Sequence, residues 1–317
     1  MAKVLVTGAS GFVGSALVPA LAAAGHRVVR VVRRGGAPGD LVVSDMIGWN
    51  PSPGELAGLD CIVHLAARAH VMGDTADSLA LYRSVNVETT RKLARAAADC
   101  GVRRFIYMSS VKVNGERTFE RPFTEVEAPR PEDAYGISKW EAEQALRKAT
   151  AGSRMECVVL RPPLIYGAGV KGNFLRLLQA VARGVPLPLA SVRNRRSLLY
   201  LGNLADAIAS CIDYPAAAGR TYLVADGEDV STPGLIRAIA AALGRPARLI
   251  PFPPVLLQAA AAMLGKADAA ARLLGSLQID AGSIQRELGW RPRCSLAQGL
   301  GTTAEWYYQQ RAAVRRP

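Results

Sequence analysis

Tyr135 and Lys139 are the two residues of this sequence whose types and spacing best suit proton transfer. They stand four positions apart in a segment predicted to be helical over 134–150, so the phenol and the ammonium point from one helical face. A neighbouring cation stabilises the phenolate and lowers the pKa of a tyrosine from its usual value of about 10. Ser110 ends a predicted strand about 25 residues earlier, and its hydroxyl would orient a carbonyl or hydroxyl while Tyr135 gives or takes the proton.

A glycine-rich turn near the N-terminus supports a catalytic role for Tyr135 and Lys139. Tyr-x-x-x-Lys alone is common in helices and usually marks a surface pair. The turn follows a predicted strand at 3–7 and opens a predicted helix at 12–25. Glycines there permit a tight turn and close approach to a pyrophosphate, and the helix N-terminus offers free N–H groups. The spacing is Gly-x-x-Gly-x-x-Gly, and the alternative is an ordinary strand–helix turn. In this position the turn predicts dinucleotide binding by Gly8, Ser10, Gly11, Phe12, Val13 and Gly14.

The end of the next predicted strand, at 27–32, bears on the choice between NAD and NADP. A carboxylate there accepts a hydrogen bond from the ribose 2′-hydroxyl of NAD, whereas an arginine accommodates the 2′-phosphate of NADP. Arg33 and Arg34 follow this strand without a carboxylate, which favours NADP(H), with Arg33 as the contact. NAD(H) stays possible, because both arginines can also be plain surface charges. Asp45, after the third predicted strand, is placed to contact the adenine edge.

Short runs of β-branched residues alternate with helical stretches through the first half of the chain. Strands are predicted at 3–7, 27–32, 41–45, 61–67, 103–110 and 155–163, and helices at 12–25, 78–101 and 134–150. Regular alternation predicts an α/β fold, a Rossmann-like doubly wound parallel sheet with helices on both faces. Such sheets bind ligands at the carboxyl ends of their strands.

The pattern changes after Pro163, where Gly, Pro and Arg become denser. We expect residues 1–163 to form a dinucleotide-binding domain, with 197–224 returning to its sheet through strands at 197–201 and 221–226. Residues 164–196 and 225–317 are expected to form a smaller C-terminal α/β domain that binds the substrate.

The composition excludes several other classes. With 50% hydrophobic and 21% charged residues, the 317-residue chain can bury a large core. The net charge of +13 favours anionic partners, but aromatics are only 6% and no basic-aromatic stripe is present, so we expect no nucleic-acid binding. The five cysteines and three histidines (His26, His64 and His70) form no metal-ligand pattern, and no metal is expected. The longest apolar stretch, 255–265, is shorter than the roughly 20 residues that cross a bilayer, and we predict a cytoplasmic protein with no membrane association.

Together these motifs resemble the extended short-chain dehydrogenase/reductase superfamily and, within it, the UDP-glucose 4-epimerase-like family of NAD-dependent epimerases and dehydratases. The matching stretches are TGASGFVG (7–14), HLAA (64–67), YMSSVKVNG (107–115), YGISK (135–139), LRPPLIYGAG (160–169) and RSLLYLGNLADA (196–207). The resemblance implies catalysis by Ser110, Tyr135 and Lys139, with the last two also contacting the cofactor, and it adds Leu65, Ala66, Ala67 and Pro162 to the cofactor site. It also implies a homodimer and a UDP-sugar substrate, bound by Ser110, Asn173, Arg196 and Arg272.

The two residues after Ser110 limit the reaction. Dehydratases of the family carry Asp-Glu directly after the catalytic Thr, whereas this chain has Val111 and Lys112, so dehydration is not expected. The reaction that the resemblance still implies is hydride transfer at C4 of a UDP-sugar, and the expected substrate is a UDP-N-acetylhexosamine derivative. The missing NAD-type carboxylate and the SSVKVNGE stretch favour a 4-ketoreductase, closest to those that make UDP-N-acetylquinovosamine for surface polysaccharides. A UDP-sugar 4-epimerase is the alternative, and a non-catalytic dinucleotide-binding protein is a third.

Overall fold

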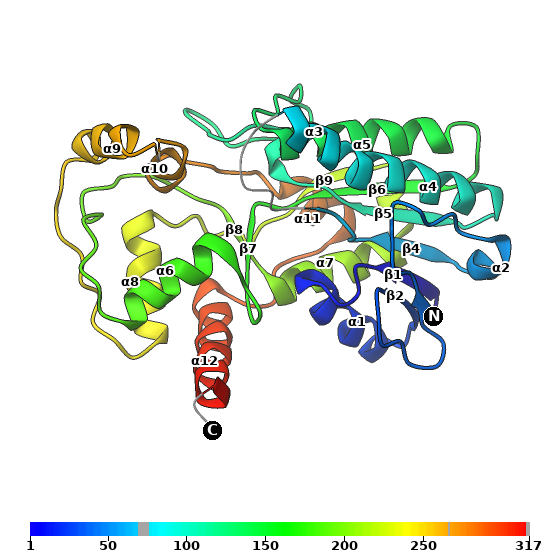
Figure 1. Ribbon diagram of the computed structural model, residues 1–317, viewed down its shortest axis with the longest axis horizontal. Helices are drawn as coiled ribbons and strands as arrows, with labels where there is room; N and C mark the ends of the chain where they lie inside the picture. The colour runs from blue at the N-terminus through cyan, green and yellow to red at the C-terminus, as the bar shows by residue number, and fades with distance from the viewer. Residues whose placement is uncertain (69–75, 266, 315–317) are drawn as a thin grey trace.

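A seven-stranded parallel sheet forms the centre of the larger domain (Figure 1). The computed structural model describes residues 1–68, 76–265 and 267–314, so His70 lies outside the described residues. The strands are β1 (Lys3–Thr7), β2 (Arg27–Val32), β3 (Leu41–Val42), β4 (Cys61–His64), β5 (Arg104–Met108), β6 (Glu156–Arg161) and β9 (Thr221–Leu223). Their spatial order is β3-β2-β1-β4-β5-β6-β9, which reverses between β1 and β4, where a doubly wound sheet opens its ligand crevice. The predicted Rossmann-like fold is confirmed.

Helices cover both faces of this sheet (Figure 1). One face carries α2 (Pro53–Leu56), α3 (Ala76–Tyr82), the π-helical segment η1 (Arg83–Glu88), α4 (Thr89–Asp99) and α5 (Ala134–Thr150), and the other carries α1 (Phe12–Ala23), α7 (Leu201–Asp213) and α11 (Gly282–Leu288). Alternate strand residues supply the two cores, because neighbouring side chains of a strand point to opposite faces. Val4 and Val6 pack with the α1 and α7 side, and Leu5 packs with the α4 and α5 side.

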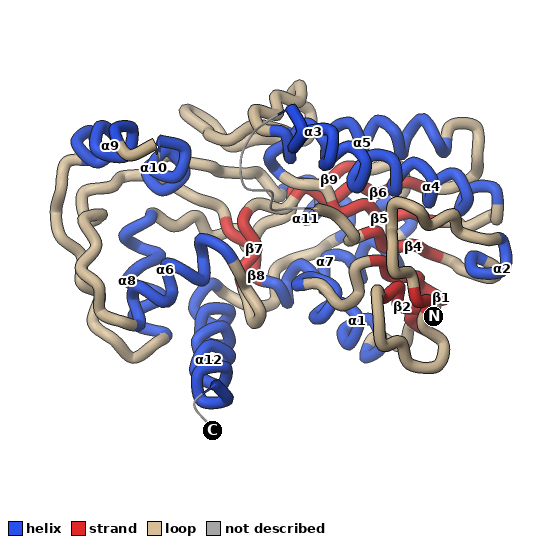
Figure 2. The backbone as a smooth tube through the Cα atoms, in the orientation of Figure 1, coloured by secondary structure: helices blue, strands red, loops and turns tan. Residues whose placement is uncertain are grey.

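Outside the central sheet, a second group of elements packs around a separate apolar cluster. These elements lie beside the seven-stranded sheet in Figure 2, and we refer to them as the second domain. It contains β7 (Leu164–Tyr166), α6 (Gly172–Ala182), β8 (Leu198–Tyr200), α8 (Thr232–Ala242), α9 (Pro254–Met263), α10 (Ala267–Leu274) and α12 (Leu296–Val314). Phe174, Ile236 and Tyr307 are among its buried residues, contributed by α6, α8 and α12. Two short 3-10 turns, η2 (Val111–Val113) and η3 (Pro215–Ala217), complete the described elements.

The expectation that strand 197–201 joins the central sheet is wrong. β8 pairs in parallel with β7 in a two-stranded sheet of its own. Arg196 forms an antiparallel bridge with Val230, and the Ser197 N–H donates to the Leu277 carbonyl at 2.9 Å, so this segment is held by second-domain partners. The chain returns to the central sheet with α7, which packs on α1, and with β9, which pairs with β6. α11, which was expected in the second domain, also lies on this sheet, where Ile284 and Leu288 join the core.

The strand predicted at 41–45 is shorter in the structure because the chain leaves the sheet after its second residue. β3 stops at Val42, since the Asp45 carboxylate accepts from the Ile47 and Gly48 N–H groups at 2.9 Å each and forms a turn. The predicted helix 78–101 is continuous but contains η1, and α5 has the predicted bounds.

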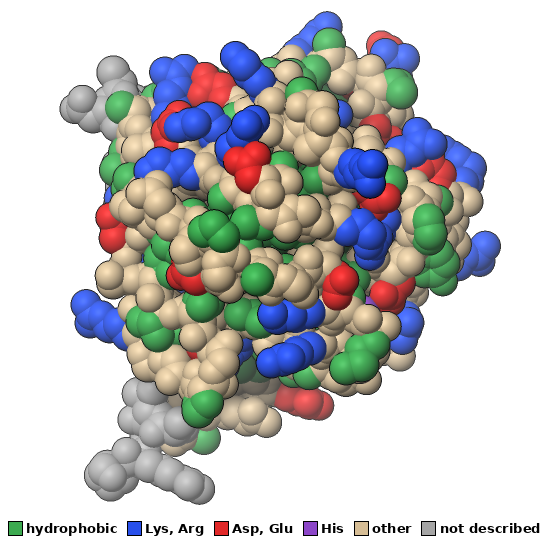
Figure 3. Space-filling model, turned by 90° about the vertical axis from the view of Figure 1, so that its right-hand side faces the viewer, with side chains coloured by type: hydrophobic (Ala, Val, Ile, Leu, Met, Phe, Trp, Pro, Cys, Tyr) green, Lys and Arg blue, Asp and Glu red, His purple; other side chains and the backbone are tan. Residues whose placement is uncertain are grey.

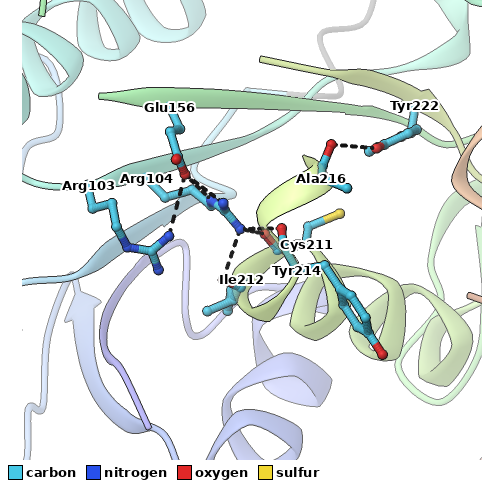
Figure 4. A network of polar contacts seen from close by, with 8 residues as sticks. All are labelled: Arg103, Arg104, Glu156, Cys211, Ile212, Tyr214, Ala216 and Tyr222. Atoms are coloured by element: carbon cyan, nitrogen blue, oxygen red, sulfur yellow. Dashed lines mark hydrogen bonds and ion pairs between the residues drawn. The ribbon is translucent and has the colours of Figure 1, made fainter. Parts of the chain in front are cut away.

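A buried arginine ties β5 to the end of α7 (Figure 4). Arg104 is 0% exposed, and its Nη1 donates to the carbonyls of Cys211, Ile212 and Tyr214 at 2.7, 3.0 and 2.9 Å. Its Nη2 also donates to Glu156 Oε2 at 2.6 Å. These carbonyls lie at the end of a helix, where intrahelical N–H donors run out, although the Tyr214 carbonyl also accepts from the Ala217 N–H at 3.2 Å. Arg104 therefore anchors α7 to the sheet.

The surface carries both signs of charge. On the face shown in Figure 3, Lys and Arg side chains lie beside Asp and Glu side chains and form no continuous basic stripe. Among the described residues, no helix has the length and apolar character needed to cross a membrane.

Candidate active site

The glycine turn has the geometry of an anion cradle. Gly8 has φ +68°, and a Cβ at this position would lie 2.9 Å from the Ala66 nitrogen. A Cβ at Gly14 would lie 2.3 Å from the Gly8 carbonyl oxygen, so only glycine fits there. α1 begins at Phe12 with Gly11 as its N-cap, and neither a side-chain cap nor an acidic residue occupies its first turn. The first N–H groups of α1 therefore remain available to a pyrophosphate, and the residues fit a dinucleotide.

The wall beside this turn is fixed by hydrogen bonds between β1 and β4. Thr7 Oγ1 lies 2.7 Å from His64 Nδ1 and accepts from the Ala66 N–H at 3.2 Å, which holds the predicted cofactor residues 65–67 next to Gly8. Burial, aided by the charge of Lys139, lowers the pKa of His64 to about 3, so the imidazole is neutral at pH 7. Pro162, also predicted for this site, is buried, and its carbonyl accepts from the Val111 N–H at 2.9 Å.

The predicted adenosine end of the site is more open. Arg33, the predicted contact to the 2′-phosphate, is exposed directly after β2. The loop that follows is anchored by a bidentate pair in which Arg30 donates to Asp40 at 2.8 and 2.5 Å. Asp45 is exposed, and its two carboxylate oxygens already hold the 45–48 turn, so it shapes this edge of the site.

Tyr135 and Lys139 face each other at the start of α5. The Lys139 Nζ lies 5.9 Å from the centroid of the Tyr135 ring and donates to the Met108 carbonyl, at the end of β5, at 2.7 Å. The Tyr82 ring packs edge-on against the Tyr135 ring at 5.8 Å. Burial lowers the pKa of Lys139 to about 7, an effect that the carboxylate of Glu143 opposes.

The prediction that the pKa of Tyr135 is lowered is wrong for this structure. Burial raises the pKa of the phenol, and the charges of Asp133 and Tyr82 raise it further. Lys139 Nζ lies 5.9 Å from the centroid of this ring and donates its hydrogen bond to the Met108 carbonyl, so its charge does not reverse the effect of burial. Tyr135 is therefore a protonated phenol at neutral pH.

Ser110 lies two residues after the end of β5 and caps η2, its Oγ accepting from the Lys112 N–H at 3.3 Å. The Lys112 ammonium contacts Asp133, the N-cap of α5, and donates to Glu116 at 2.6 Å. Since Asp133 also accepts from the Gly136 N–H at 2.7 Å, this contact joins the segment with Ser110 to the helix turn with Tyr135. The structure thus brings Ser110, Tyr135 and Lys139 to one edge of the sheet.

Two of the predicted substrate residues lie together. Arg196 Nη1 donates to the carbonyls of Arg272 and Gly275 at 2.5 and 3.1 Å, at the C-terminal end of α10. Arg272 Nε lies 3.9 Å from Glu116 Oε2, which links this pair to the neighbourhood of Lys112. Burial lowers the pKa of Arg196, and the nearby Arg272 charge adds to that effect, which the Glu116 carboxylate opposes. Asn173 is exposed at the start of α6, and no hydrogen bond within the described residues joins it to this set.

Comparison with known proteins places the chain in a family. The profile of the NAD dependent epimerase/dehydratase family matches residues 4–225. The chain belongs to this family. A UDP-glucose 4-epimerase of Vibrio cholerae is 42% identical over 314 residues, which cover 97% of this chain and 96% of that protein. The N-acetyl-alpha-D-glucosaminyl-diphospho-ditrans,octacis-undecaprenol 4-epimerase of Escherichia coli O157:H7 is 28% identical and covers 96% of this chain and 95% of its own length.

A solved structure agrees with this assignment to the epimerase/dehydratase family. MoeE5 in complex with UDP-glucuronic acid and NAD superposes with a TM-score of 0.77 and 27% identity, covering 97% of this chain and 99% of that one. The family resemblance inferred from the motifs is therefore confirmed.

The family resemblance implies that Asn86 is a buried, structural residue of the long helix. Its side chain, on η1, bonds Ser138 Oγ at 2.9 Å and both backbone groups of Arg68, holding the loop after β4 against α5. Sequence reasoning missed a second buried polar residue. Glu143 was not singled out at all, although it is 0% exposed and lies one helical turn beyond Lys139. An acidic residue on the same helical face as Tyr135 and Lys139 is the signal that could have found it.

Proposed function

We propose that this chain is an NAD(P)-dependent enzyme that transfers hydride at C4 of a UDP-sugar, and that its net reaction is C4 epimerisation. The observation that carries the proposal is that Ser110, Tyr135 and Lys139 lie at the carboxyl ends of the parallel strands, where the glycine turn also lies. The Vibrio cholerae relative bears the name UDP-glucose 4-epimerase, and MoeE5 was solved with a UDP-sugar derivative and NAD.

The side chains divide the work of the reaction. The glycine turn and the first N–H groups of α1 would hold the pyrophosphate, and a bound dinucleotide supplies the hydride acceptor and donor. Tyr135 donates its phenolic proton to an alkoxide at C4 and takes a proton from a C4 hydroxyl as phenolate, with Lys139 as the cation that stabilises the phenolate. Ser110 orients the C4 oxygen. A proton donor of this kind contributes roughly 10²–10⁴-fold to the rate.

Elimination of water lacks support in this site. Val111 and Lys112 stand where the dehydratases carry their carboxylates, and the Lys112 ammonium is engaged by Asp133 and Glu116. A cation in that position cannot abstract a proton as a carboxylate base would. Among the reactions of this family, hydride transfer without dehydration is therefore the one that this site supports.

A 4-ketoreductase is the second candidate, and one observation favours it. Arg33 is exposed at the end of β2, where NAD-specific sites carry a carboxylate, so NADP(H) is the cofactor that this end would prefer. A reductase exchanges its cofactor at each turnover, whereas an epimerase returns the hydride to the same substrate.

The test is a comparison of two reactions with one purified protein. In the first, UDP-N-acetylglucosamine or UDP-glucose is incubated without added dinucleotide; we expect the C4 epimer to form with no net change in nicotinamide absorbance. In the second, a UDP-4-keto-6-deoxy sugar is incubated with NADPH; stoichiometric loss of NADPH would identify the reductase instead. Dinucleotide binding with neither reaction would overturn both candidates in favour of a non-catalytic binding protein.

We also propose that the protein works as a cytoplasmic homodimer. All five cysteines are free thiols, as is usual in a reducing compartment. The helices α4 and α5 pack side by side on the outer face of the larger domain, where the resemblance places a dimer contact (Figure 1). Light scattering coupled to gel filtration tests this, because a monomeric mass would contradict it.

A further inference from the structure

A network of buried polar side chains lies between α5 and the carboxyl ends of β5 and β6. Its members are 3% exposed or less: Ser109, Asn114, Lys139, Glu143 and Arg161. Glu143 Oε1 accepts from Ser109 Oγ at 2.5 Å and from Arg161 Nε at 2.9 Å, and Glu143 Oε2 accepts from Arg161 Nη2 at 2.6 Å. Arg161 Nη1 also donates to Asn114 Oδ1 at 3.1 Å.

Stability alone is a weak reason for such a network. Taking charges out of water is costly, and apolar side chains of similar volume often replace a buried ion pair at no loss of stability. Of the three buried charges here, only Lys139 has a place in the proposed reaction. The position of the other two relative to Lys139 and Ser110 is therefore the informative feature.

Two successive residues of the chain join the end of β5 to α5. The Met108 carbonyl accepts from Lys139 Nζ at 2.7 Å, and Ser109 Oγ donates to Glu143. The next residue is Ser110. The position of its hydroxyl relative to Tyr135 is thus set by two contacts of one helix face, one turn apart.

Glu143 is also the carboxylate that acts on Lys139. The titratable groups facing Lys139 are Tyr135 and Glu143 on α5, Tyr107 on β5 with its ring 4.7 Å from Nζ, and the neutral His64 on β4. Burial depresses the pKa of the ammonium, and Glu143 opposes that effect. Arg161, through its two hydrogen bonds, keeps the Glu143 side chain in place.

We propose that Glu143, anchored by Arg161, is a positioning residue for the Ser110–Tyr135–Lys139 set. Its carboxylate holds the strand end that carries Ser110 and presents a negative charge to Lys139, one helical turn away. This inference rests on the proposed function, because it assigns Glu143 a role in the same reaction.

The test compares Glu143→Gln with Glu156→Gln. Both residues pair with a buried arginine, and Glu156, at the opposite end of β6 from Arg161, pairs with Arg104 far from the site. In Glu143→Gln the alkaline limb of the kcat–pH profile is expected to move to lower pH by about one unit. At a pH above this limb, kcat should be roughly ten-fold lower than in wild type, and the difference should become smaller as the pH is lowered. Glu156→Gln should leave the limb in place. An alkaline limb that stays in place in Glu143→Gln, whatever the loss of activity at other pH values, overturns the proposal, because the carboxylate then has no effect on Lys139.

A second measurement separates this inference from the proposed function. Calorimetric titration with the dinucleotide alone is carried out across the same pH range. The affinity should fall as the pH rises in both proteins, and this fall should begin at a lower pH in Glu143→Gln than in wild type. The reason is that Lys139, which faces the anionic ligand, loses its proton at a lower pH in the variant. Wild type that binds dinucleotide but converts no UDP-sugar contradicts only the proposed function. Identical pH dependence in the two proteins contradicts the role of Glu143. Should Glu143→Gln not fold, Glu143→Gln combined with Arg161→Gln removes the unpaired guanidinium and is expected to show the same shift.

Discussion

At Tyr135, burial and a neighbouring cation act in opposite directions on one phenol. Burial, together with Asp133 and Tyr82, raises the pKa of Tyr135, and the Lys139 ammonium lies 5.9 Å from its ring. A protonated phenol is suited to donate a proton, and the cation is needed when the same group must accept one. In the proposed reaction, the pair would therefore serve both directions of hydride transfer at C4.

Removing the phenolic oxygen tests this role. In Tyr135→Phe we expect turnover of the UDP-sugar to fall roughly 10²–10⁴-fold, because the proton donor is lost while the ring packing against Tyr82 is kept. Dinucleotide affinity, measured by calorimetry, should change little. Turnover within a few-fold of wild type would show that another group transfers the proton.

The glycine turn can be tested with a single methyl group. In Gly14→Ala the added Cβ would meet the Gly8 and Ala9 carbonyl oxygens at 2.3 and 2.6 Å, so the turn must open and dinucleotide affinity should fall about ten-fold or more. Gly301→Ala is the matched control, because it adds a methyl group in a helix interior with nothing within 4 Å. The control should bind normally and gain about 0.5–1 kcal/mol of stability. Equal binding by both variants would remove the turn from the cofactor site.

At the scale of elements, local signals decided which predictions succeeded. α5 was predicted with its exact bounds because its start is signalled locally by the Asp133 cap, which accepts from the Gly136 N–H. Strand 197–201 was recognised as a strand, but its partner β7 was not, since alternation of side chains says nothing about which sheet receives a strand. Glu143 was missed for a related reason: its partners Ser109 and Arg161 come from two other elements.

The anchoring of α7 to β5 gives a prediction at this scale. Arg104→Met leaves three carbonyls at the end of α7 and the Glu156 carboxylate without their buried partner, so the free energy of unfolding should fall by about 3–5 kcal/mol (Figure 4). Arg103→Met removes the neighbouring, half-exposed partner of the same carboxylate and should cost less than about 1 kcal/mol. Urea unfolding of both variants measures the difference, and similar small losses would show that Arg104 does not anchor the helix.

At the scale of the whole molecule, the cofactor turn touches the second domain. Phe12, the first residue of α1, packs against the second-domain cluster, and a Cβ at Gly169 would lie 3.5 Å from its ring. The turn predicted to hold the pyrophosphate is therefore in contact with the domain that carries Arg196 and Arg272. Binding of the dinucleotide at this turn is therefore expected to stabilise the packing of the second domain against α1.

The global stability of the protein should depend on pH through one buried imidazole. The pKa of His64 is lowered to about 3 by burial, whereas the unfolded chain titrates near the ordinary value of about 6.5. Below the higher value the unfolded state binds the proton and the folded state does not, so stability falls as the pH drops from 6.5 toward 3, by about 1.4 kcal/mol per unit. In His64→Gln this contribution disappears, and the loss of stability between pH 6 and pH 4, measured by urea unfolding, should be smaller than in wild type by roughly 2–3 kcal/mol. Tyr107→Phe, which alters the ring stacked on His64 at 6.0 Å without a charge change, should keep the wild-type slope. If His64→Gln also keeps that slope, the imidazole is protonated in the folded protein and the acid sensitivity arises elsewhere.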